Sequence, residues 1–437
     1  MELLIKIIQF FLCFTILVGL HELGHFVMAR LFKIRVEKFY IFFDPWFSLF
    51  KFRRGQTEYG LGWVPLGGYV KIAGMIDESM DKEQMKQPPK PDEFRSKPAW
   101  QRFFVLIAGV VMNVLLAITI YCAVCYVWGE SYFSNQDARW GYRFNESGHA
   151  LGFRDGDRFV SIDGEPVDNV VRVVNDLLIT ESDRTVVVER DGREVELLLP
   201  FDELVEMRRN KGYEGLFVPY QPFVIDSVVR KEVSALHAGD EVIAIDSLHG
   251  VDFTAYSDYL KSHAGQAVSI RVLRGEEQVV ELPLTVDADG RLGVLCRSLP
   301  LRTQHYTFWQ SIPAGIRKTG HVVGSYWDQL KLIVQPKTKM YEELGGFIAI
   351  GSIFSGSWNW EDFWLKTAFL SIILAVMNIL PIPGLDGGHA LFTFWEMLTG
   401  RKVSDRVLVA AQYVGLGLLL FLLIYANGND IYRFFLK

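Results

Sequence analysis

Four long apolar segments constrain the fold of this chain more than any other feature of its sequence. They cover residues 3–29, 102–128, 363–382 and 407–426. A helix needs roughly 20 mainly apolar residues to cross the hydrocarbon core of a bilayer. We therefore predict a polytopic α-helical membrane protein with four transmembrane helices, in agreement with a content of 50% hydrophobic residues.

Basic residues next to the apolar segments indicate the orientation in the membrane. Short loops rich in Lys and Arg stay on the cytoplasmic side. Such residues occur between spans one and two and between spans three and four: Arg30, Lys33, Arg35, Lys38, Lys90, Arg95, Lys97, Arg102, Arg401, Lys402 and Arg406. We therefore expect both termini and the region 129–360 to be extracytoplasmic. Lys6, Arg433 and Lys437 favour the opposite orientation, but they are fewer.

The charge balance gives no support for nucleic-acid binding. The chain has 45 Lys and Arg against 51 Asp and Glu, a formal net charge of −6. A nucleic-acid-binding domain would show a basic patch or stripe instead. We expect the lipid bilayer and other membrane proteins to be its partners.

The sequence HELGH at 21–25 places two imidazoles and a carboxylate at the end of the first apolar segment. Polar side chains are costly at membrane depth and are usually functional there. Histidines four residues apart share one helix face, so His21 and His25 can bind one metal ion. Glu22 points about 100° away around the helix axis, where it can act as a general base. The motif predicts a zinc hydrolase, and two unrelated surface histidines are the alternative.

A hydrolytic zinc site needs a third protein ligand and one open position. The best candidate is Asp386, in the sequence NILPIPGLDGGH at 378–389. The two prolines are expected to break the third helix, and the glycines permit close backbone packing. His389 is a second candidate, either as a competing ligand or as a residue that supports the ligands. A helix cap followed by a turn would use the same residue types.

The segment 57–72, TEYGLGWVPLGGYVKI, has the pattern of two short strands joined by a turn. Its glycine pair favours a turn or bulge, and Pro65 favours an edge position. The apolar and aromatic residues predict a β-hairpin, within about 55–75, that enters the membrane surface. Non-helical backbone at membrane depth must be covered by protein or water. An ordinary soluble hairpin is the alternative.

The region 129–300 contains an internal repeat. The sequence GFRDGDRFVSID at 152–163 recurs as ALHAGDEVIAID at 235–246, an offset of 83 residues. Each copy precedes a helix-like stretch, 168–179 or 253–263, and then a pair of alternating strands. We predict two tandem β-rich domains that resemble PDZ domains, which bind extended peptides by strand addition. A pair of spacers with blocked grooves is the alternative. Residues 305–335 then predict an amphipathic helix, on the membrane surface or packed on the repeats.

Taken together, these motifs resemble the site-2 protease family, and most closely the bacterial regulator-of-sigma-E proteases, the RIP metalloproteases. PLGGYVK at 65–71, Gly109-x-x-x-Asn113 and LGG at 344–346 match as well. The resemblance implies one zinc ion held by the residues His21, His25 and Asp386, with Glu22 as the base. It also implies substrate-binding residues, namely Asn378, Pro381, Pro383, Gly67, Gly68 and Tyr69. One departure is FFDP at 42–45, where the family commonly has a glycine-rich stretch.

The resemblance implies an intramembrane zinc metalloendopeptidase of the bacterial inner membrane. Its substrates would be transmembrane segments of single-span proteins, such as anti-sigma factors or remnant signal peptides. The segment 57–72 would bind the unwound substrate, and the PDZ pair would exclude substrates with large extracytoplasmic domains.

Two other classes of protein remain to be distinguished. A metal transporter would carry polar residues through several spans, but the second and fourth segments contain almost no acids or histidines. A non-catalytic scaffold would keep the repeats without the complete His-Glu-His-Asp set. The expected boundaries are 1–30 (first span), 31–99 (cytoplasmic loop), 100–128 (second span), 129–215 and 216–300 (PDZ domains), 301–360 (amphipathic linker), 361–390 (third span with the Asp ligand) and 391–437 (fourth span and C-terminus).

Overall fold

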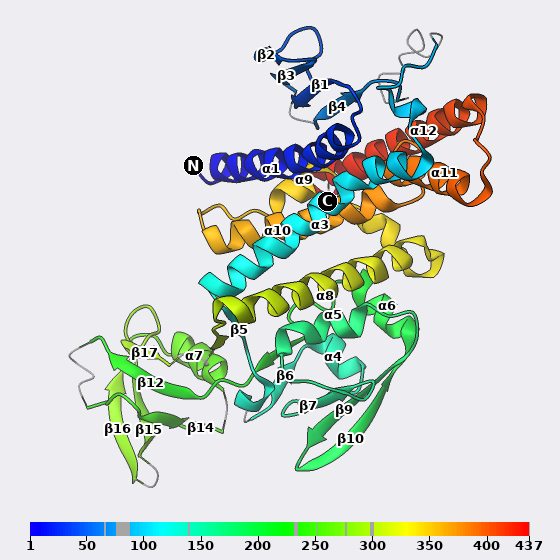
Figure 1. Ribbon diagram of the computed structural model, residues 1–437. Coiled ribbons are helices and arrows are strands. Elements are labelled where there is room, and N and C mark those ends of the chain that lie inside the picture. Colours follow the sequence, from blue (N-terminus) through cyan, green and yellow to red (C-terminus); the bar gives the residue numbers. More distant parts are fainter. Residues whose placement is uncertain are drawn as a thin grey trace. The chain divides into compact units, whose positions relative to one another are not determined.

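The computed structural model describes residues 1–64, 67–75, 88–138, 140–230, 235–250, 252–275, 278–297 and 301–436. The predicted edge position of Pro65 therefore lies outside the described residues. The chain forms two compact units (Figure 1). The membrane unit comprises Met1–Glu130 and His305–Lys437, and the repeat unit comprises Ser131–Gln304.

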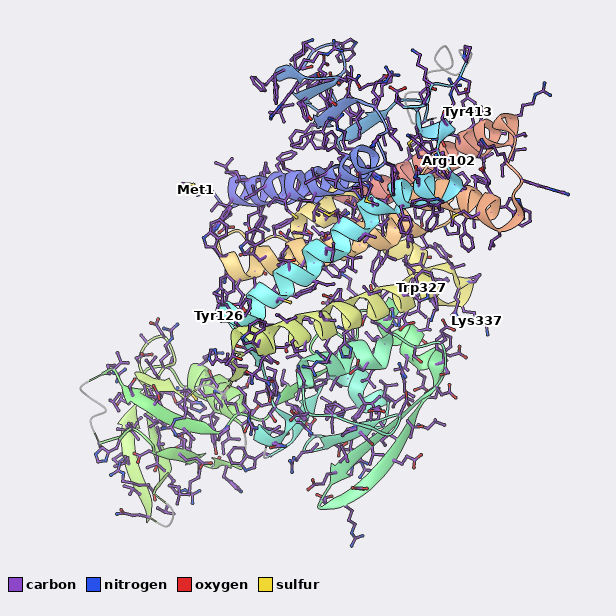
Figure 2. All side chains as sticks on the ribbon, viewed as in Figure 1. Met1, Arg102, Tyr126, Trp327, Lys337 and Tyr413 are labelled. Atoms are coloured by element: carbon purple, nitrogen blue, oxygen red, sulfur yellow. The ribbon has the colours of Figure 1, made fainter. Side chains whose placement is uncertain are left out.

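Among the described residues, the membrane unit contains four helices with the length and composition to cross a membrane, in agreement with the four predicted apolar segments. They are α1 (Glu2–Leu31), α3 (Ala99–Val127), α10 (Trp360–Ile379) and α12 (Asp405–Ile431). Helix α3 packs against α1 and α10, and also against α8 (Phe308–Val334) and α11 (Asp386–Thr399). Figure 2 labels Arg102 and Tyr126 near the two ends of α3. Because α3 contacts four helices, it is the central element of this unit.

Helix α10 ends where two prolines interrupt the chain. Leu380 has extended backbone angles, as a residue before proline favours, and Pro381 has no N–H to continue the helix. Gly384 then adopts a φ of +99° in the turn. The next helix, α11, begins at Asp386. The third helix is therefore interrupted at the two prolines, as expected, and Asp386 belongs to a separate helix.

A four-stranded sheet follows α1. Its strands are β1 (Val36–Ile41), β2 (Phe50–Arg54), β3 (Thr57–Leu61) and β4 (Tyr69–Ile72), in the order β2-β3-β1-β4. The predicted hairpin over 57–72 is wrong, because β3 and β4 do not pair with each other. Strand β1 lies between them, parallel to β3 and antiparallel to β4. The hairpin in this sheet is β2–β3, which turns at Gly55 with a φ of +64°.

Strand β1 is central because it carries the apolar side chains that the sheet buries. Val36 and Tyr40 are fully buried, and Ile72 of β4 packs into the same core as Ala29 of α1 and Val105 of α3. The sheet is therefore held on the end of α1 by a continuous apolar core. This leaves β4 at one edge of the described sheet.

Helix α8 is amphipathic as predicted, and it packs on α3 and α10. Its side chains Val322, Val323 and Tyr326 join an apolar cluster with residues of those helices. Thr307 and Gln310 form a reciprocal capping box at its start, which satisfies N–H groups at the helix N-terminus. The short elements of the membrane unit are η1 (Phe94–Ser96), η5 (Pro336–Thr338), η6 (Met340–Glu343), α9 (Phe347–Ser352) and η7 (Tyr432–Leu436).

The repeat unit contains two copies of one arrangement of four strands, and in the second copy two further strands join the same sheet. The first copy comprises η2 (Asn135–Asp137), β6 (Tyr142–Phe144), α4 (Glu146–Ala150), β7 (Arg158–Ile162), β8 (Glu165–Pro166), η3 (Val170–Arg172), α5 (Val173–Leu178), β9 (Arg184–Arg190), β10 (Arg193–Leu199), α6 (Phe201–Arg209) and β11 (Phe217–Pro219). The second comprises β12 (Phe223–Val228), β13 (Glu241–Ile245), β14 (Leu248–His249), α7 (Phe253–Ser262), β15 (Ala267–Arg274), β16 (Gln278–Thr285) and β17 (Val294–Cys296). Strands β5 (Glu130–Tyr132) and β18 (Arg302–Gln304) pair with each other. In the first copy, β7 follows the Gly-Asp motif and pairs with β9 of the β9–β10 hairpin and with the two-residue strand β8. In the second copy, β13 pairs in the same way with β15 of the β15–β16 hairpin and with β14.

The two copies share an ion pair as well as a strand order. The guanidinium of Arg190 donates two hydrogen bonds to the buried carboxylate of Asp157, and Arg274 makes the same pair with Asp240. Each copy also has its own apolar core. The repeat seen in the sequence is therefore a repeat of structure.

Candidate metal centre

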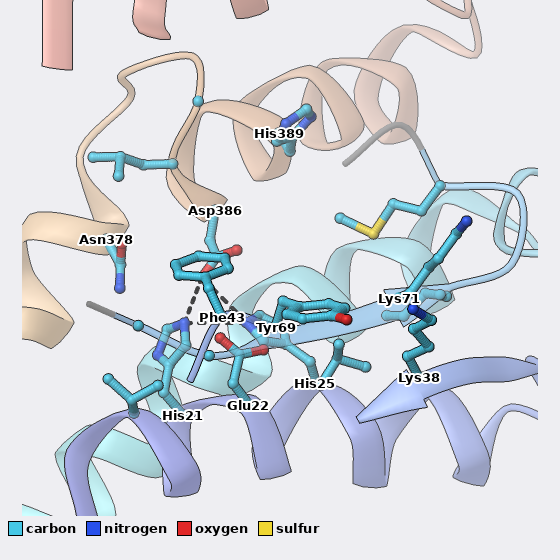
Figure 3. A pocket seen from close by; sticks show the side chains of 18 of the residues that line it. His21, Glu22, His25, Lys38, Phe43, Tyr69, Lys71, Asn378, Asp386 and His389 are labelled. Atoms are coloured by element: carbon cyan, nitrogen blue, oxygen red, sulfur yellow. Dashed lines mark hydrogen bonds and ion pairs between the residues drawn. The ribbon is translucent and has the colours of Figure 1, made fainter. Parts of the chain in front are cut away.

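The structure brings Asp386 to two histidines that precede it by 361 and 365 positions in the sequence. His21 and His25 lie one turn apart on α1, and Asp386 is the first residue of α11 (Figure 3). Asp386 Oδ2 lies 3.0 Å from His21 Nε2 and 3.3 Å from His25 Nε2, and the two Nε2 atoms are 3.2 Å apart. These three are the one His/Cys/Asp/Glu group among the described residues that is arranged to hold a metal ion.

Two glycines let α1 and α3 approach closely enough to form this group. A Cβ at Gly109 of α3 would lie 2.5 Å from His25 Nε2 and 2.6 Å from His21 Cε1. A Cβ at Gly24 of α1 would overlap the Ala108 carbonyl oxygen. The helix crossing therefore requires glycine at both positions, since real side-chain carbons do not fit at such distances.

Hydrogen bonds behind the imidazoles set which ring nitrogen faces Asp386. His25 Nδ1 lies 2.8 Å from the Val105 carbonyl oxygen. A carbonyl only accepts, so Nδ1 carries the proton and the Nε2 lone pair is available to a metal. His21 Nδ1 faces the Asn113 side-chain amide at 3.1 Å.

The orientation of the Asn113 amide follows from its neighbours. Its nitrogen faces His21, and its oxygen is buried without a partner among the described residues. The oxygen and nitrogen of an amide are assigned from the hydrogen-bond network. Exchanging them lets the oxygen accept from His21 Nδ1–H. His21 Nε2 then also presents a lone pair toward Asp386.

These donors fit a zinc ion. A tetrahedral ion with bonds of about 2.0 Å has edges of about 3.3 Å between ligand atoms, close to the three separations observed. Two unprotonated ring nitrogens and a carboxylate oxygen repel one another unless a cation lies between them. Asp386 Oδ2 is buried without a hydrogen-bond partner among the described residues, as expected of an atom reserved for a metal. The set supplies three protein ligands, as in catalytic zinc sites.

Glu22 lies beside the three donors and is held by the sheet. Val70 of β4 lines the same cavity as Glu22. A Cβ at Gly68 would lie 3.3 Å from Glu22 Cγ and 2.8 Å from the Tyr40 carbonyl oxygen, so glycine permits this close approach of the chain to α1. Figure 3 shows the Glu22 carboxylate on the same side of α1 as Tyr69. The edge strand β4 therefore borders the site.

A cavity of about 970 Å³ adjoins the donors. Its lining contains Glu22 and most of the residues predicted to bind substrate, namely Asn378, Gly67, Gly68 and Tyr69. Pro381 and Pro383 are not in the described lining, so the structure does not bring them to this wall. His389 lines the cavity, but it is outside the group of three donors, and Figure 3 shows it further along α11.

An aromatic stack stiffens the cavity wall at the FFDP segment. The ring of Tyr69 lies between those of Tyr40 and Phe43, with centroids 5.2 and 6.0 Å away and nearly parallel planes. The Tyr69 hydroxyl donates to Asp44 at 2.9 Å, and Ser48 donates to the same carboxylate. Burial, and secondly Asp44, raises the pKa of Tyr69, so the phenol stays protonated and keeps this bond.

Sequence reasoning missed part of this site. It noted Gly109 and Asn113 as motif matches and gave them no task, and it treated Asp44 only as a departure. The spacing of Gly109 and Asn113, one helical turn apart in an apolar segment, was the available signal. Gln412 also lines the cavity, and its signal was a lone amide in an otherwise apolar span.

Comparison with known proteins identifies the family. The family model described as "Peptidase family M50" matches residues 9–422. The chain belongs to peptidase family M50. This is the site-2 protease family, so the resemblance found in the sequence is confirmed, and this M50 protein is a zinc metalloprotease.

Relatives of this M50 protease agree over nearly its whole length. A "Putative zinc metalloprotease" of Xylella fastidiosa (strain 9a5c) is 30% identical over 447 residues, which cover 96% of each chain. A "Regulator of sigma E protease" of Haemophilus influenzae is 28% identical over 467 residues, 97% of this chain and 98% of that protein. A "Putative zinc metalloprotease" of Treponema pallidum (strain Nichols) is 25% identical over 456 residues, 98% and 99% of the two chains.

Proposed function

We propose that this zinc metalloprotease hydrolyses peptide bonds within the transmembrane segments of single-span membrane proteins. One observation carries the proposal. Both histidines and Glu22 lie on α1, which has the length and composition of a membrane span, and Asp386 follows α10, another such helix. A site built from these helices meets peptide bonds at membrane depth.

In the proposed mechanism, Glu22 is the general base and the residues His21, His25 and Asp386 hold zinc. Zinc, when bound, lowers the pKa of water and stabilises negative charge on the substrate carbonyl. Glu22 takes a proton from the attacking water and passes it to the leaving amine. Asn378, on the cavity wall, assists by donating a hydrogen bond to the carbonyl oxygen.

A transmembrane helix must unwind before it is cut, because its carbonyl groups are engaged in internal hydrogen bonds. Strand β4 is an edge of its sheet and borders Glu22. An unwound substrate can add to this edge as a further strand, with Gly67, Gly68 and Tyr69 beside it. Pro381 and Pro383 keep the connection from α10 to α11 non-helical.

The substrate class and the location are further parts of the proposal. Anti-sigma factors and remnant signal peptides are single-span substrates of this kind, and the name of the Haemophilus influenzae relative supports the first. The likeness to the "Regulator of sigma E protease" favours the inner membrane, and the basic loops favour an orientation with the repeat unit on the extracytoplasmic side. In this proposal the two repeats are PDZ domains that bind extended peptides or exclude substrates with bulky extracytoplasmic domains.

The test uses the full chain in lipid nanodiscs with a single-span substrate. We expect the wild type to cleave within the substrate's membrane segment. Glu22→Gln keeps the shape of the side chain and removes the base, so kcat should fall by at least about 100-fold while zinc content stays unchanged by elemental analysis.

Glu2→Gln is the matched control, because Glu2 lies at the other end of α1. Its cleavage rate should equal that of the wild type. Normal turnover by Glu22→Gln would contradict the base assignment. A zinc-loaded wild type that leaves every membrane segment intact would contradict the substrate class.

A further inference from the structure

Gln412 is a polar residue in the fourth membrane-spanning helix that the metal centre does not explain. It lies on α12, is 6% exposed, and lines the same cavity as Glu22 and Asp386. Its Oε1 is shielded from solvent and has no hydrogen-bond partner among the described residues. A buried amide without partners is costly, particularly where no bulk water is at hand.

Close packing fixes the face of α12 that carries Gln412. Gly415 lies one turn further along, on the same side of the helix. A Cβ at Gly415 would overlap the Pro383 carbonyl oxygen, and Gly384 packs against Gly415 and Leu416. Helix α12 therefore lies directly on the turn that leads to Asp386. This contact holds Gln412 at the cavity.

Other polar residues of α12 have structural tasks. Near the end of the helix, Asn427 accepts from the Phe347 N–H, Asn429 donates to the Leu344 carbonyl, and Asp430 accepts from the Ala349 N–H. Gln412 makes no comparable bond to the described chain, and it is not one of the three metal donors. An apolar residue at this position would avoid the free-energy cost of burying an unpaired amide. The hydrogen-bond partner of Gln412 is therefore expected among the molecules that occupy the cavity.

We propose that Gln412 is a substrate-binding residue whose amide hydrogen-bonds the main chain of the unwound peptide. This inference rests on the proposed function. An unwound segment has lost its helical hydrogen bonds and exposes N–H and C=O groups. A primary amide can donate a hydrogen bond to a C=O group and accept one from an N–H group. Such binding does not depend on the side chains of the substrate. Gln412 then binds the backbone from α12, while β4 binds it from the sheet.

The first experiment compares Gln412→Met with the wild type in nanodiscs. Methionine keeps the length of the side chain and removes the amide. We expect kcat/KM for the single-span substrate to fall about five- to tenfold, as for the loss of one hydrogen bond. Zinc content and melting temperature should stay unchanged.

Gln9→Met is the matched control. Gln9 is also a buried glutamine in a membrane-spanning helix with an unpaired Oε1. Its Nε2 donates to the Ser355 carbonyl at 2.8 Å, and it does not line the cavity. We expect Gln9→Met to leave kcat/KM unchanged per zinc-loaded enzyme, even where it lowers the melting temperature.

A second experiment asks whether the contact is to the substrate backbone. Single amides around the mapped cleavage site are replaced by esters, which removes one N–H and weakens the carbonyl as an acceptor. At the contacted position the ester should lower kcat/KM of the wild type and have no further effect on Gln412→Met. Such non-additivity indicates a direct interaction.

The outcomes separate this inference from the proposed function. Equal kcat/KM for Gln412→Met and the wild type, or additive ester effects at every position, would overturn the inference and leave the proposed function standing. Absence of cleavage by the wild type would contradict the proposed function itself. If Gln412→Met fails to fold or to bind zinc, Gln412→Asn gives the same comparison, because it keeps an amide but withdraws it by one methylene group.

Discussion

At the scale of residues, the candidate metal centre is oriented by contacts to the side chains of its members. In each histidine the contact is to Nδ1, the ring nitrogen that faces away from Asp386. His25 is oriented by the Val105 carbonyl, and His21 by the Asn113 side chain. Glu22 packs closely against the chain at Gly68, just before β4. The ligand atoms therefore meet without rearrangement of the side chains. A site preorganised in this way loses function when either a ligand or its supporting partner changes.

We expect Asp386→Ala to lower zinc affinity by more than tenfold, because even the loss of a supporting residue costs about 10- to 100-fold. His389→Ala is the comparison, since His389 lies outside the group of three donors, and it should retain zinc. Both variants are measured by competition with a chelator of known affinity. Retention of zinc by Asp386→Ala together with its loss from His389→Ala would identify His389 as the ligand.

At the scale of elements, the site depends on how closely two helices cross. We expect Gly109→Ala to lose bound zinc while the protein remains folded, because the added methyl group would occupy the space of the two imidazoles. Gly417→Ala on α12 is the control, since a Cβ there meets nothing within 4 Å. It should be neutral or slightly stabilising, as alanine is a better helix former than glycine.

The two glycine variants are compared by zinc content and by melting temperature. Full zinc occupancy in Gly109→Ala would mean that α3 can move away from α1 without harm to the site. The close crossing of α1 and α3 would then contribute to helix packing and would not be required for zinc binding.

At the scale of the whole molecule, the repeat unit carries one ion pair twice. Hydrogen bonds from Arg274 are the main cause of the lowered pKa of Asp240. A carboxylate with a lowered pKa stabilises the fold above its unfolded value of about 3.9, and this contribution is lost as the pH falls through the folded value. Asp240→Asn should therefore destabilise the second repeat at neutral pH and lose its effect in acid.

Hydrogen exchange of the full chain measures this prediction. Amides of β13 and β15 should exchange about tenfold faster in Asp240→Asn than in the wild type at pH 7, with the difference shrinking below about pH 4. Asp157→Asn is the matched variant and should act on β7 and β9 of the first repeat. A pH-independent difference for Asp240→Asn would show that lost packing, and not charge, is responsible.

The sequence by itself determined features that are local or that recur. Four apolar segments gave four candidate spans, because length and hydropathy need no partner to be read. His21, Glu22 and His25 could be placed around one helix turn because helical spacing fixes their directions. The recurrence of one sequence pattern after 83 residues indicated the repeat. The prolines at 381 and 383 indicated the end of a helix. Asp386 could be predicted as a ligand because a carboxylate beside an apolar span is energetically costly and is usually functional.

Tertiary structure alone decided which distant segments meet. Alternating residues identified β3 and β4 as strands, but strand pairing depends on β1, which inserts between them through its buried Val36 and Tyr40. Gly109 and Gln412 gain a task only because α3 and α12 pack against the site. Such contacts join residues from about twenty to several hundred positions apart, and no local spacing encodes them. They follow from close packing of apolar side chains between elements of the membrane unit.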